Sequence, residues 1–573
     1  MPGSRLSVIT MRKLPAMETP MSDSIRFPTR EPVDFVIIGS GAAGGVLAKE
    51  LATSGFDVVV LEQGPYRRPS EFSHDELDVI FNNAYSGGTS GDYPQTYRQK
   101  ESERAEVTDF PAAYYARMVG GSSVHYSANF WRLRPLDFNE RSRLGGIAGT
   151  GFADWPLSYE ELEPYYTKVD WEIGVSGAPG PFDPPRSKPY PVPPMPLKSS
   201  GALLEMGARK LGLHAQPAPV AILSQPHNGR PACIHCGFCM GFGCEANAKS
   251  STLATMIPLA EATGHCEIRP LSTVYKLETD ANGRVSDVLY FDERGLSQGQ
   301  KAKAVILAAN GAETPRLLLE SESSRFPDGL ANSSGKVGKY LMFNSHSSSN
   351  AMFEHDLNEY KSIQCTRIVQ DFYESDAKRG FYGGGVIDAR PFLSATPIFY
   401  ALNGLPPDTP TWGSEFKRAL AEGFTRRLSI LGSGTSLARE SNSISLDPEL
   451  KDRHGRAALR VTYEDHPDDL ALARFLQDRS VELMEAVGAK KIWRDPVEVQ
   501  SITAHLLGTC RMGDDPHESV VDRDHRSHDV PNLFICDGSS LVTSGRGQPT
   551  MTIQALAFRA ADRIRDFSKN NQI

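Results

Sequence analysis

A glycine-rich turn between a short apolar strand and a helix is the feature that most constrains what this chain folds into. The run 34–38 is largely apolar and rich in β-branched residues, which is typical of a strand covered on both faces. Three glycines follow at the spacing G-x-G-x-x-G, namely Gly39, Gly41 and Gly44. Apolar residues then recur at helical spacing up to Gly55, and a second apolar run occupies 58–61. Strand, helix and strand in this order predict a βαβ unit of a parallel sheet.

The same segment predicts a dinucleotide site. The first glycine of this motif permits a tight turn, the second lets the backbone approach a pyrophosphate, and the third lets helix and strand pack closely. The helix start, with Ala42 and Ala43, offers N–H groups and a positive dipole end to the phosphates. Glu62 closes the second strand, where a carboxylate accepts hydrogen bonds from ribose hydroxyls and disfavours a 2′-phosphate. The motif alone does not separate NAD from FAD.

Length, charge and hydropathy narrow the class of protein. The chain has 573 residues, enough for a large core and an internal ligand site. Its formal net charge of -9 argues against nucleic acid as the main partner, which usually requires a basic face. The sequence lacks the long apolar run of a membrane span, and residues 1–30 lack the apolar core of a secretory signal. We expect a disordered leader over 1–30 and a cytoplasmic protein, or a periplasmic one if a partner subunit carries it across a membrane.

Two regions of α/β character flank a middle that is rich in predicted strands. Residues 273–292 predict a hairpin, 304–309 predict another buried strand, and alternating segments between 340 and 500 favour an antiparallel sheet. Residues 533–567 return to strand and helix. We therefore expect an α/β fold, an α+β composite in which a Rossmann-type nucleotide domain is interleaved with an antiparallel-sheet substrate domain. The expected ranges are 31–160, 201–340 and 501–573 for the nucleotide domain, 161–200 for an excursion or linker, and 341–500 for the substrate domain.

Further segments carry a resemblance to a known family. They read VGGSSVH at 119–125, ANGAETPR at 309–316, HLLGTCRMG at 505–513, and NLFICDGS at 532–539 with QPTMT at 548–552. Together with the glycine-rich turn, they resemble the glucose–methanol–choline (GMC) oxidoreductases, in order from about residue 33 to 567. That family is FAD-dependent, so the resemblance implies FAD as the cofactor.

The resemblance also implies contacts to the cofactor. They are Gly120, Gly121 and Ser122 on the isoalloxazine side, and Asp537 and Gly538 at the pyrophosphate and ribityl region. Val274 lies in the strand that contacts adenine in relatives, and Thr550 belongs to the C-terminal motif. His125 stands where some relatives attach the flavin covalently. A covalent bond and a non-covalent contact near the ring are both open at this position.

Oxidation of an alcohol needs a hydride acceptor and a base for the hydroxyl proton. Flavin N5 supplies the first, and a histidine suits the second because its ordinary pKa lies near neutrality. His505 matches the catalytic histidine of the family. Gln548 stands at the second catalytic position, where relatives carry His or Asn, so the sequence departs from the family pattern here. An amide still orients a substrate oxygen but cannot share proton transfer, and a plain turn residue is the alternative.

Four cysteines fall close together, at Cys233, Cys236, Cys239 and Cys244. Thiolates at two-residue spacing on a glycine-containing loop can converge on one metal centre. A subset of the family, multi-subunit sugar dehydrogenases, carries such cysteines and passes electrons onward through an iron–sulfur cluster. The resemblance therefore implies a cluster and a small companion subunit, with a structural zinc site or plain thiols as the alternatives.

Within the family, the resemblance is strongest to FAD-dependent glycoside 3-dehydrogenases. We expect an enzyme that oxidises a secondary alcohol of a sugar or glycoside, with C3 of a pyranoside as the favoured carbon. Electrons would pass to a non-oxygen acceptor or an electron-transfer subunit. An oxidase that uses dioxygen is the alternative enzyme, and a non-redox GMC flavoprotein is the alternative from another class. Arg511 and Arg546 are the arginines that could pair with an anionic substrate such as a sugar acid, with a structural role as the favoured alternative for Arg511, which belongs to the family motif.

Overall fold

The computed structural model describes residues 26–81, 92–390 and 396–573. Most of the predicted leader, residues 1–25, lies outside the described residues. At the end of the leader, Arg26 Nη1 donates to Gly264 O at 3.0 Å and Phe27 N donates to a Glu267 carboxylate oxygen at 3.0 Å. In the three described ranges, no helix is long and apolar enough to cross a membrane.

The predicted βαβ unit forms the centre of a seven-stranded sheet. β1 (Val33–Ile38) pairs in parallel with β2 (Val58–Leu61), and α1 (Ala42–Thr53) connects the two strands. β6 (Cys266–Arg269) extends the sheet beyond β2, and β9 (Ser297–Leu307) lies parallel to β1 on its other side. The central residues of β1 are fully buried, as the apolar run predicts for a strand covered on both faces.

β9 gives this parallel sheet an antiparallel edge. Its second half pairs in parallel with β17 (Leu533–Ile535), while its first half pairs antiparallel with β8 (Val285–Phe291). β8 and β7 (Thr273–Thr279) form the predicted hairpin. The strand is longer than the predicted 304–309, because residues 297–301 (SQGQK) are polar or glycine, mostly exposed or partly buried, and so lack an apolar run.

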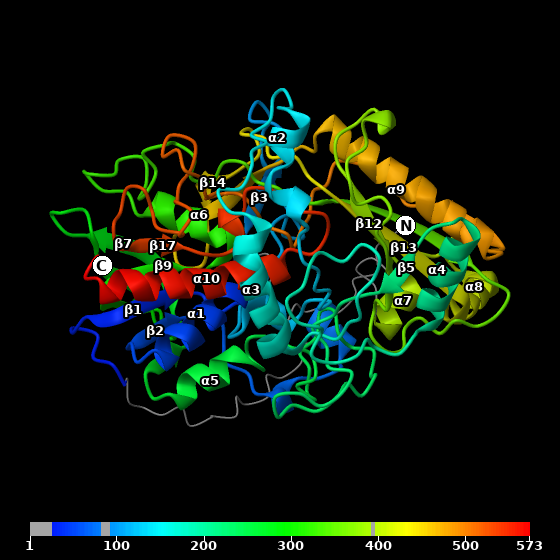
Figure 1. Cartoon of the computed structure of the whole chain (residues 1–573), viewed down its shortest axis with the longest axis horizontal. Helices are drawn as coiled ribbons and strands as arrows, with labels where there is room; N and C mark the ends of the chain where they lie inside the picture. The colour runs from blue at the N-terminus through cyan, green and yellow to red at the C-terminus, as the bar shows by residue number, and fades with distance from the viewer. Residues whose placement is uncertain (1–25, 82–91, 391–395) are drawn as a thin grey trace, which may run out of the picture.

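Helices pack on this sheet and set the position of the ligand site. α10 (Thr550–Lys569) and α1 lie side by side on one face, α5 (Met256–Ala262) also contacts α1, and α3 (Tyr159–Val169) crosses α10 (Figure 1). Met551, Ala555 and Phe558 place the apolar stripe of α10 towards the core. α6 (Asn310–Glu320) begins directly after β9, so two helices start at the carboxyl ends of parallel strands. Ligands of open α/β sheets bind at that edge.

The second sheet is antiparallel throughout and lies at the other end of the molecule (Figure 1). Its order is β16 (Lys491–Arg494), β10 (Ser345–Met352), β13 (Arg427–Gly434), β12 (Gly385–Asp388), β11 (Arg367–Val369) and β5 (Ala215–Pro217). α9 (Pro467–Ala486) contacts β10 and β13, and α4 (Ser199–Lys210) contacts α9. β5 and α4 therefore lie with this sheet, although they precede residue 341.

Two strands of the middle region belong to a third sheet instead. β14 (Ser443–Lys451) and β15 (Ala457–Thr462) pair antiparallel, and β15 then pairs in parallel with β3 (Gln95–Arg98), which is followed by β4 (Glu106–Val107). The alternating pattern indicates these strands but not their partner, because pairing with β3 joins segments more than 350 residues apart. α6 packs on β14.

Short elements connect the sheets. They are the helices α2 (Glu140–Leu144), α7 (Pro397–Leu402) and α8 (Gly413–Arg426), 3₁₀ turns at Pro69–Glu71, Gly121–Val124, Pro135–Phe138, Ala377–Arg379 and Gly538–Ser540, and π turns at Leu77–Phe81 and Asp170–Gly174. The predicted excursion over 161–200 contains α3 and is then irregular up to the start of α4.

Candidate active site

A single cavity of about 650 Å³ runs between the two large sheets. One end lies at the carboxyl edge of β1 and β2, and the other end is lined by side chains of the antiparallel sheet and of the loop before α10. We call these the nucleotide end and the substrate end. The predicted site residues that line the cavity are Gly39, Gly41, Ala42, Ala43, Glu62, Gly121, Ser122, His125, Val274, His505, Asp537, Gly538, Gln548 and Thr550.

The glycine-rich turn is closely packed on one side and open on the other. A Cβ at Gly39, whose φ is +93°, would lie 2.6 Å from Ala308 O, and one at Gly44 would lie 1.9 Å from Gly39 O. A Cβ at Gly41 would instead meet only Gly121 Cα, at 3.9 Å. Gly41 thus keeps the cavity side of the turn clear, while Gly44 does not line the cavity and allows α1 to pack against the turn.

Glu62 is held in place by the turn that it faces. Ser40 Oγ donates to one carboxylate oxygen at 2.7 Å, Ser40 N donates to the same oxygen at 3.1 Å, and Gly64 N donates to the other at 3.0 Å. Burial raises the pKa of Glu62, and these hydrogen bonds oppose the effect. The oxygen that accepts from Gly64 N keeps lone-pair capacity for a further donor, which suits the predicted ribose contact.

Asp537 connects the C-terminal motif to the start of α6. One carboxylate oxygen accepts from Asn310 N at 3.0 Å and Thr314 Oγ1 at 2.6 Å, and the other accepts from Ser539 N at 2.8 Å. Asn310 has a φ of +79° and itself lines the cavity. The sequence motif over 309–316 contains Asn310 and Thr314, but their contact with Asp537 follows from the fold.

The segment predicted to face the flavin ring follows a tight turn. Gly120 has a φ of +93°, does not line the cavity, and donates its N–H to Ser40 Oγ at 3.0 Å. His125 lies with Nε2 2.8 Å from Met118 Sδ. Burial lowers the pKa of His125 to about 3, with Lys249 and Arg67 adding to the effect. The ring is therefore neutral near pH 7, and covalent attachment at this residue stays a prediction.

The substrate end brings His505 and Gln548 together with a second histidine, His346. The rings of His346 and His505 lie 5.7 Å apart, and His505 Nδ1 lies 3.0 Å from Asn344 Oδ1. Burial, with smaller effects of His346 and Arg390, lowers the pKa of His505 to about 3, and a hydrogen bond with Gln548 works the other way. Among the described residues, Gln548 Nε2 has no hydrogen-bond partner although it is buried. The Gln548 Nε2 group, unlike the rest of this amide, is therefore an unused donor beside a neutral histidine.

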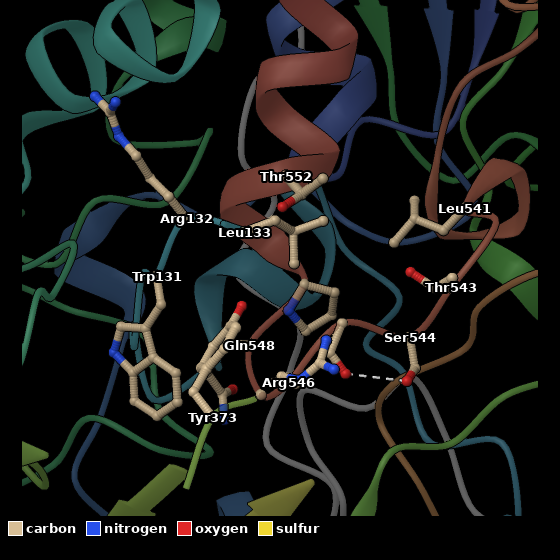
Figure 2. Close-up of a pocket in the computed structure, with 13 residues that line it drawn as sticks. Trp131, Arg132, Leu133, Tyr373, Leu541, Thr543, Ser544, Arg546, Gln548 and Thr552 are labelled. Atoms are coloured by element: carbon tan, nitrogen blue, oxygen red, sulfur yellow. Dashed lines mark hydrogen bonds between the residues drawn. The ribbon is translucent and has the colours of Figure 1, made fainter. Parts of the chain in front are cut away.

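Arg390 is the arginine that lines the substrate end, rather than Arg511 or Arg546. Its Nε donates to Asp388 at 2.6 Å, and both side chains are buried. Arg546 forms ion pairs with Asp137 and Glu140, and Figure 2 shows it beside Tyr373 and Ser544, on the same loop as Gln548. Arg511 Nη1 donates to Gly151 O at 2.7 Å, which makes its role structural.

The four clustered cysteines line a separate, small cavity of about 20 Å³. The loop adjoins the flavin-facing segment, because Gly241 N donates to His125 O at 2.7 Å. Backbone N–H groups approach two of the thiols, His235 N to Cys233 Sγ at 3.3 Å and Lys249 N to Cys244 Sγ at 3.5 Å. Over the described ranges, however, no three His, Cys, Asp or Glu side chains are placed to hold a metal ion. The thiols as arranged do not fit a cluster, so we derive no electron path through one.

Three residues of the substrate end escaped the sequence analysis: Asn344, His346 and Arg390. The one available signal is the run 345–350 (SHSSSN), which is polar yet uncharged and forms a largely buried strand. Nothing in the sequence indicates which cavity that strand would line.

The fold and the cavity define an α/β oxidoreductase with a dinucleotide site next to a histidine-containing substrate end. Two family models described as GMC oxidoreductase match residues 33–342 and 438–557. The chain belongs to the GMC oxidoreductase family, whose members use FAD and act on CH–OH groups. The open side of Gly41, the orientation of Glu62 and the cavity that continues to His505 all fit this cofactor.

Named relatives match almost the whole chain. 2-Methyl-1,2-propanediol dehydrogenase of Mycolicibacterium austroafricanum is 37% identical over 93% of this chain and 95% of its own. The fructose dehydrogenase large subunit of Gluconobacter japonicus is 31% identical over 93% and 97%. Among solved structures, pyridoxine 4-oxidase from Mesorbium loti gives a TM-score of 0.60 at 17% identity, covering 93% of this chain and 99% of that one. Aspergillus oryzae formate oxidase gives 0.68 at 14%, covering 95% and 100%.

Proposed function

We propose that this enzyme oxidises a secondary alcohol carbon of a neutral sugar or glycoside to a ketone and passes the electrons to a non-oxygen acceptor. The observation that carries the proposal is that His505 and Gln548 line one cavity and that Gln548 Nε2 has no hydrogen-bond partner within the described part of the chain. FAD, when bound, supplies the hydride acceptor.

His505 and Gln548 have different roles at the substrate hydroxyl. His505 is neutral near pH 7, so a ring nitrogen accepts the hydroxyl proton as the carbon loses hydride. Gln548 Nε2 donates to the same oxygen and stabilises the negative charge that develops there. Because the amide carries no titratable proton, proton transfer rests on His505.

The position of Arg390 favours a substrate that carries hydroxyl groups besides the one that is oxidised. Asp388 already neutralises its charge, so a neutral polyol binds without leaving a buried net charge, whereas a carboxylate would add a second anion beside Asp388. The guanidinium donors not used by Asp388 suit hydroxyl oxygens next to the reacting carbinol. This pair is the reason we favour a neutral sugar over a sugar acid.

C3 of a pyranoside is the first carbon to test. A small vicinal diol is the second candidate, favoured by the 37% identity to a relative named for 2-methyl-1,2-propanediol. The relative named as a large subunit supports a companion subunit as the electron acceptor.

An anaerobic titration of the FAD-loaded protein tests the proposal. The probes are methyl α-D-glucopyranoside, 2-methyl-1,2-propanediol and gluconate, and the readout is bleaching of the flavin absorbance. We expect the glucoside to bleach the flavin and the product to be a keto-glycoside by mass spectrometry. Bleaching by the diol alone would move the assignment to small diols, and bleaching by gluconate alone would contradict the neutral-substrate argument.

The electron acceptor is tested separately. Turnover with a dye such as dichlorophenolindophenol should exceed the rate of dioxygen consumption. The opposite order would make the enzyme an oxidase. A flavin that no alcohol or sugar reduces would refute the proposed reaction.

A further inference from the structure

Asn344 contacts both histidines of the substrate end. Its side-chain oxygen lies 3.0 Å from His505 Nδ1, and its backbone oxygen lies 3.1 Å from His346 Nδ1. The residue is fully buried and has a φ of +63°. Asparagine tolerates that left-handed conformation better than most residues with a Cβ.

The orientation of the Asn344 amide follows from its other neighbours. The amide nitrogen lies 3.1 Å from Gly434 O, 3.2 Å from Ser544 O and 3.2 Å from Gly545 O. Backbone carbonyls only accept hydrogen bonds, so the NH₂ group must face these three oxygens. The reversed amide would place its oxygen against three carbonyls. Oδ1 therefore faces His505 and can only accept.

The protonation pattern of the histidines follows. Because Asn344 Oδ1 only accepts, Nδ1 of His505 carries the hydrogen and donates it. The backbone carbonyl of Asn344 imposes the same choice on His346. We propose that Asn344 is a positioning residue that fixes His505 and His346 as Nδ1–H tautomers, with the lone pair of each ring on Nε2. The proposal deepens the proposed function, because it names Nε2 as the atom of His505 that accepts the proton.

Asn344 also connects His505 to the loop that carries Gln548. Two of the three carbonyls that it holds, Ser544 O and Gly545 O, belong to the loop that leads to Gln548. Without this amide, His505 would no longer be held in one tautomer, and the distance between His505 and Gln548 would no longer be fixed. A wrong tautomer presents N–H, not a lone pair, to the substrate hydroxyl, and this is a known route to large losses of rate.

Two variants and a matched control separate these roles. Asn344→Gly keeps the left-handed backbone and the carbonyl to His346 but deletes the amide. Asn344→Asp keeps an oxygen that accepts from His505 Nδ1 but replaces the donors to the three carbonyls. Asn442→Gly is the control, because Asn442 is also buried and its side chain bonds to the backbone of Glu464, at 3.0 and 3.1 Å.

The kinetic readout is anaerobic flavin reduction per bound FAD, with methyl α-D-glucopyranoside as the first probe and 2-methyl-1,2-propanediol as the second. We expect Asn344→Gly to slow it by about 100-fold or more, the low end of what a positioned base contributes. Asn344→Asp should move the acid limb of the pH profile to higher pH, because a carboxylate beside His505 raises the pKa of that ring. Asn442→Gly should lower thermal stability and leave both readouts unchanged.

The direct readout is ¹⁵N NMR of the histidine-labelled holoenzyme, with the His505 signals identified by their loss in His505→Gln. We expect a protonated Nδ1 and an unprotonated Nε2 in the native enzyme and in Asn344→Asp. An Nε2–H tautomer in the native enzyme would overturn the proposal, as would a native rate and pH limb in Asn344→Gly. If neither variant folds, the spectrum of the native enzyme still decides the tautomer. The spectrum needs no substrate, so failure of the proposed reaction is distinguishable from failure of the tautomer assignment.

Discussion

The two ends of the cavity are built in different ways. At the nucleotide end the backbone makes the site: a glycine turn, two helix starts, and carboxylates held by N–H groups of nearby residues. At the substrate end side chains make the site, and they come from segments at 344–346, 388–390, 505 and 548. A site that the backbone builds is therefore predictable from one short motif, whereas a site built from distant side chains depends on tertiary packing.

The largest loss of activity should come from a substitution at the substrate end. We expect His505→Ala to slow anaerobic flavin reduction by about 10²–10⁴-fold, since it removes the general base. Bound FAD should stay near one equivalent, because the nucleotide end is untouched. The measurement is stopped-flow absorbance under saturating substrate.

His525→Ala is the matched control for that prediction. His525 is also buried with a pKa lowered to about 4, mainly by burial, but it bonds to Ile535 O at 2.9 Å and is absent from the cavity lining. It should lose stability without losing rate per flavin. Equal rate losses in both variants would mean that histidine burial, not catalysis, explains the effect of His505→Ala.

At the nucleotide end, a larger side chain should instead weaken binding of the cofactor. We expect Gly41→Val to fold normally, because a Cβ there meets nothing closer than 3.9 Å, but to weaken FAD binding by roughly 10–100-fold through overpacking against the cofactor. Bound flavin is measured by absorbance after gel filtration, and folding by the melting temperature of the flavin-free protein.

Gly146→Val provides the comparison for Gly41→Val. Among the described atoms, a Cβ at Gly146 would meet Arg141 Nη2 alone, at 3.8 Å, and the residue is not part of the cavity lining. It should change neither flavin content nor melting temperature. A Gly41→Val protein that melts early without FAD would show that the turn needs glycine for folding and not for cofactor approach.

Most residues that the sequence predicts for the nucleotide end line one cavity, because the turn, the helix start and Glu62 lie within 24 consecutive residues. The sequence also indicated most strands by their apolar or alternating patterns. It could not assign β15 to β3, since periodicity carries no information on partners so distant in the chain. Asn344, His346 and Arg390 were missed for the same reason: their chemistry appears only when β10, β12 and the loops at 505 and 548 meet.

A substitution of Arg390 should have a smaller effect, on substrate binding at the substrate end. Arg390→Lys keeps the charge that Asp388 needs but loses the planar fork of donors. We expect KM for methyl α-D-glucopyranoside to rise about tenfold, consistent with one charge-assisted hydrogen bond, while kcat changes little. Cyclohexanol, which has the carbinol but no second oxygen, is the control substrate and should not respond. A uniform loss with both substrates would assign Arg390 a structural role.

The smallest expected effect is the response of the native enzyme to acid. Burial lowers the pKa of His505 to about 3, so the neutral, proton-accepting form persists as pH falls and is lost only near that value. A histidine with its ordinary pKa of about 6.5 would lose roughly 30-fold of its neutral form by pH 5. We therefore expect kcat/KM for anaerobic flavin reduction to change by less than about threefold between pH 8 and pH 5, with flavin absorbance confirming that FAD stays bound. An acid limb near pH 6.5 would show that water enters the substrate end freely. The two ends would then differ in the atoms that build them but not in their access to water. Burial could then no longer explain why His505 is neutral and able to accept a proton.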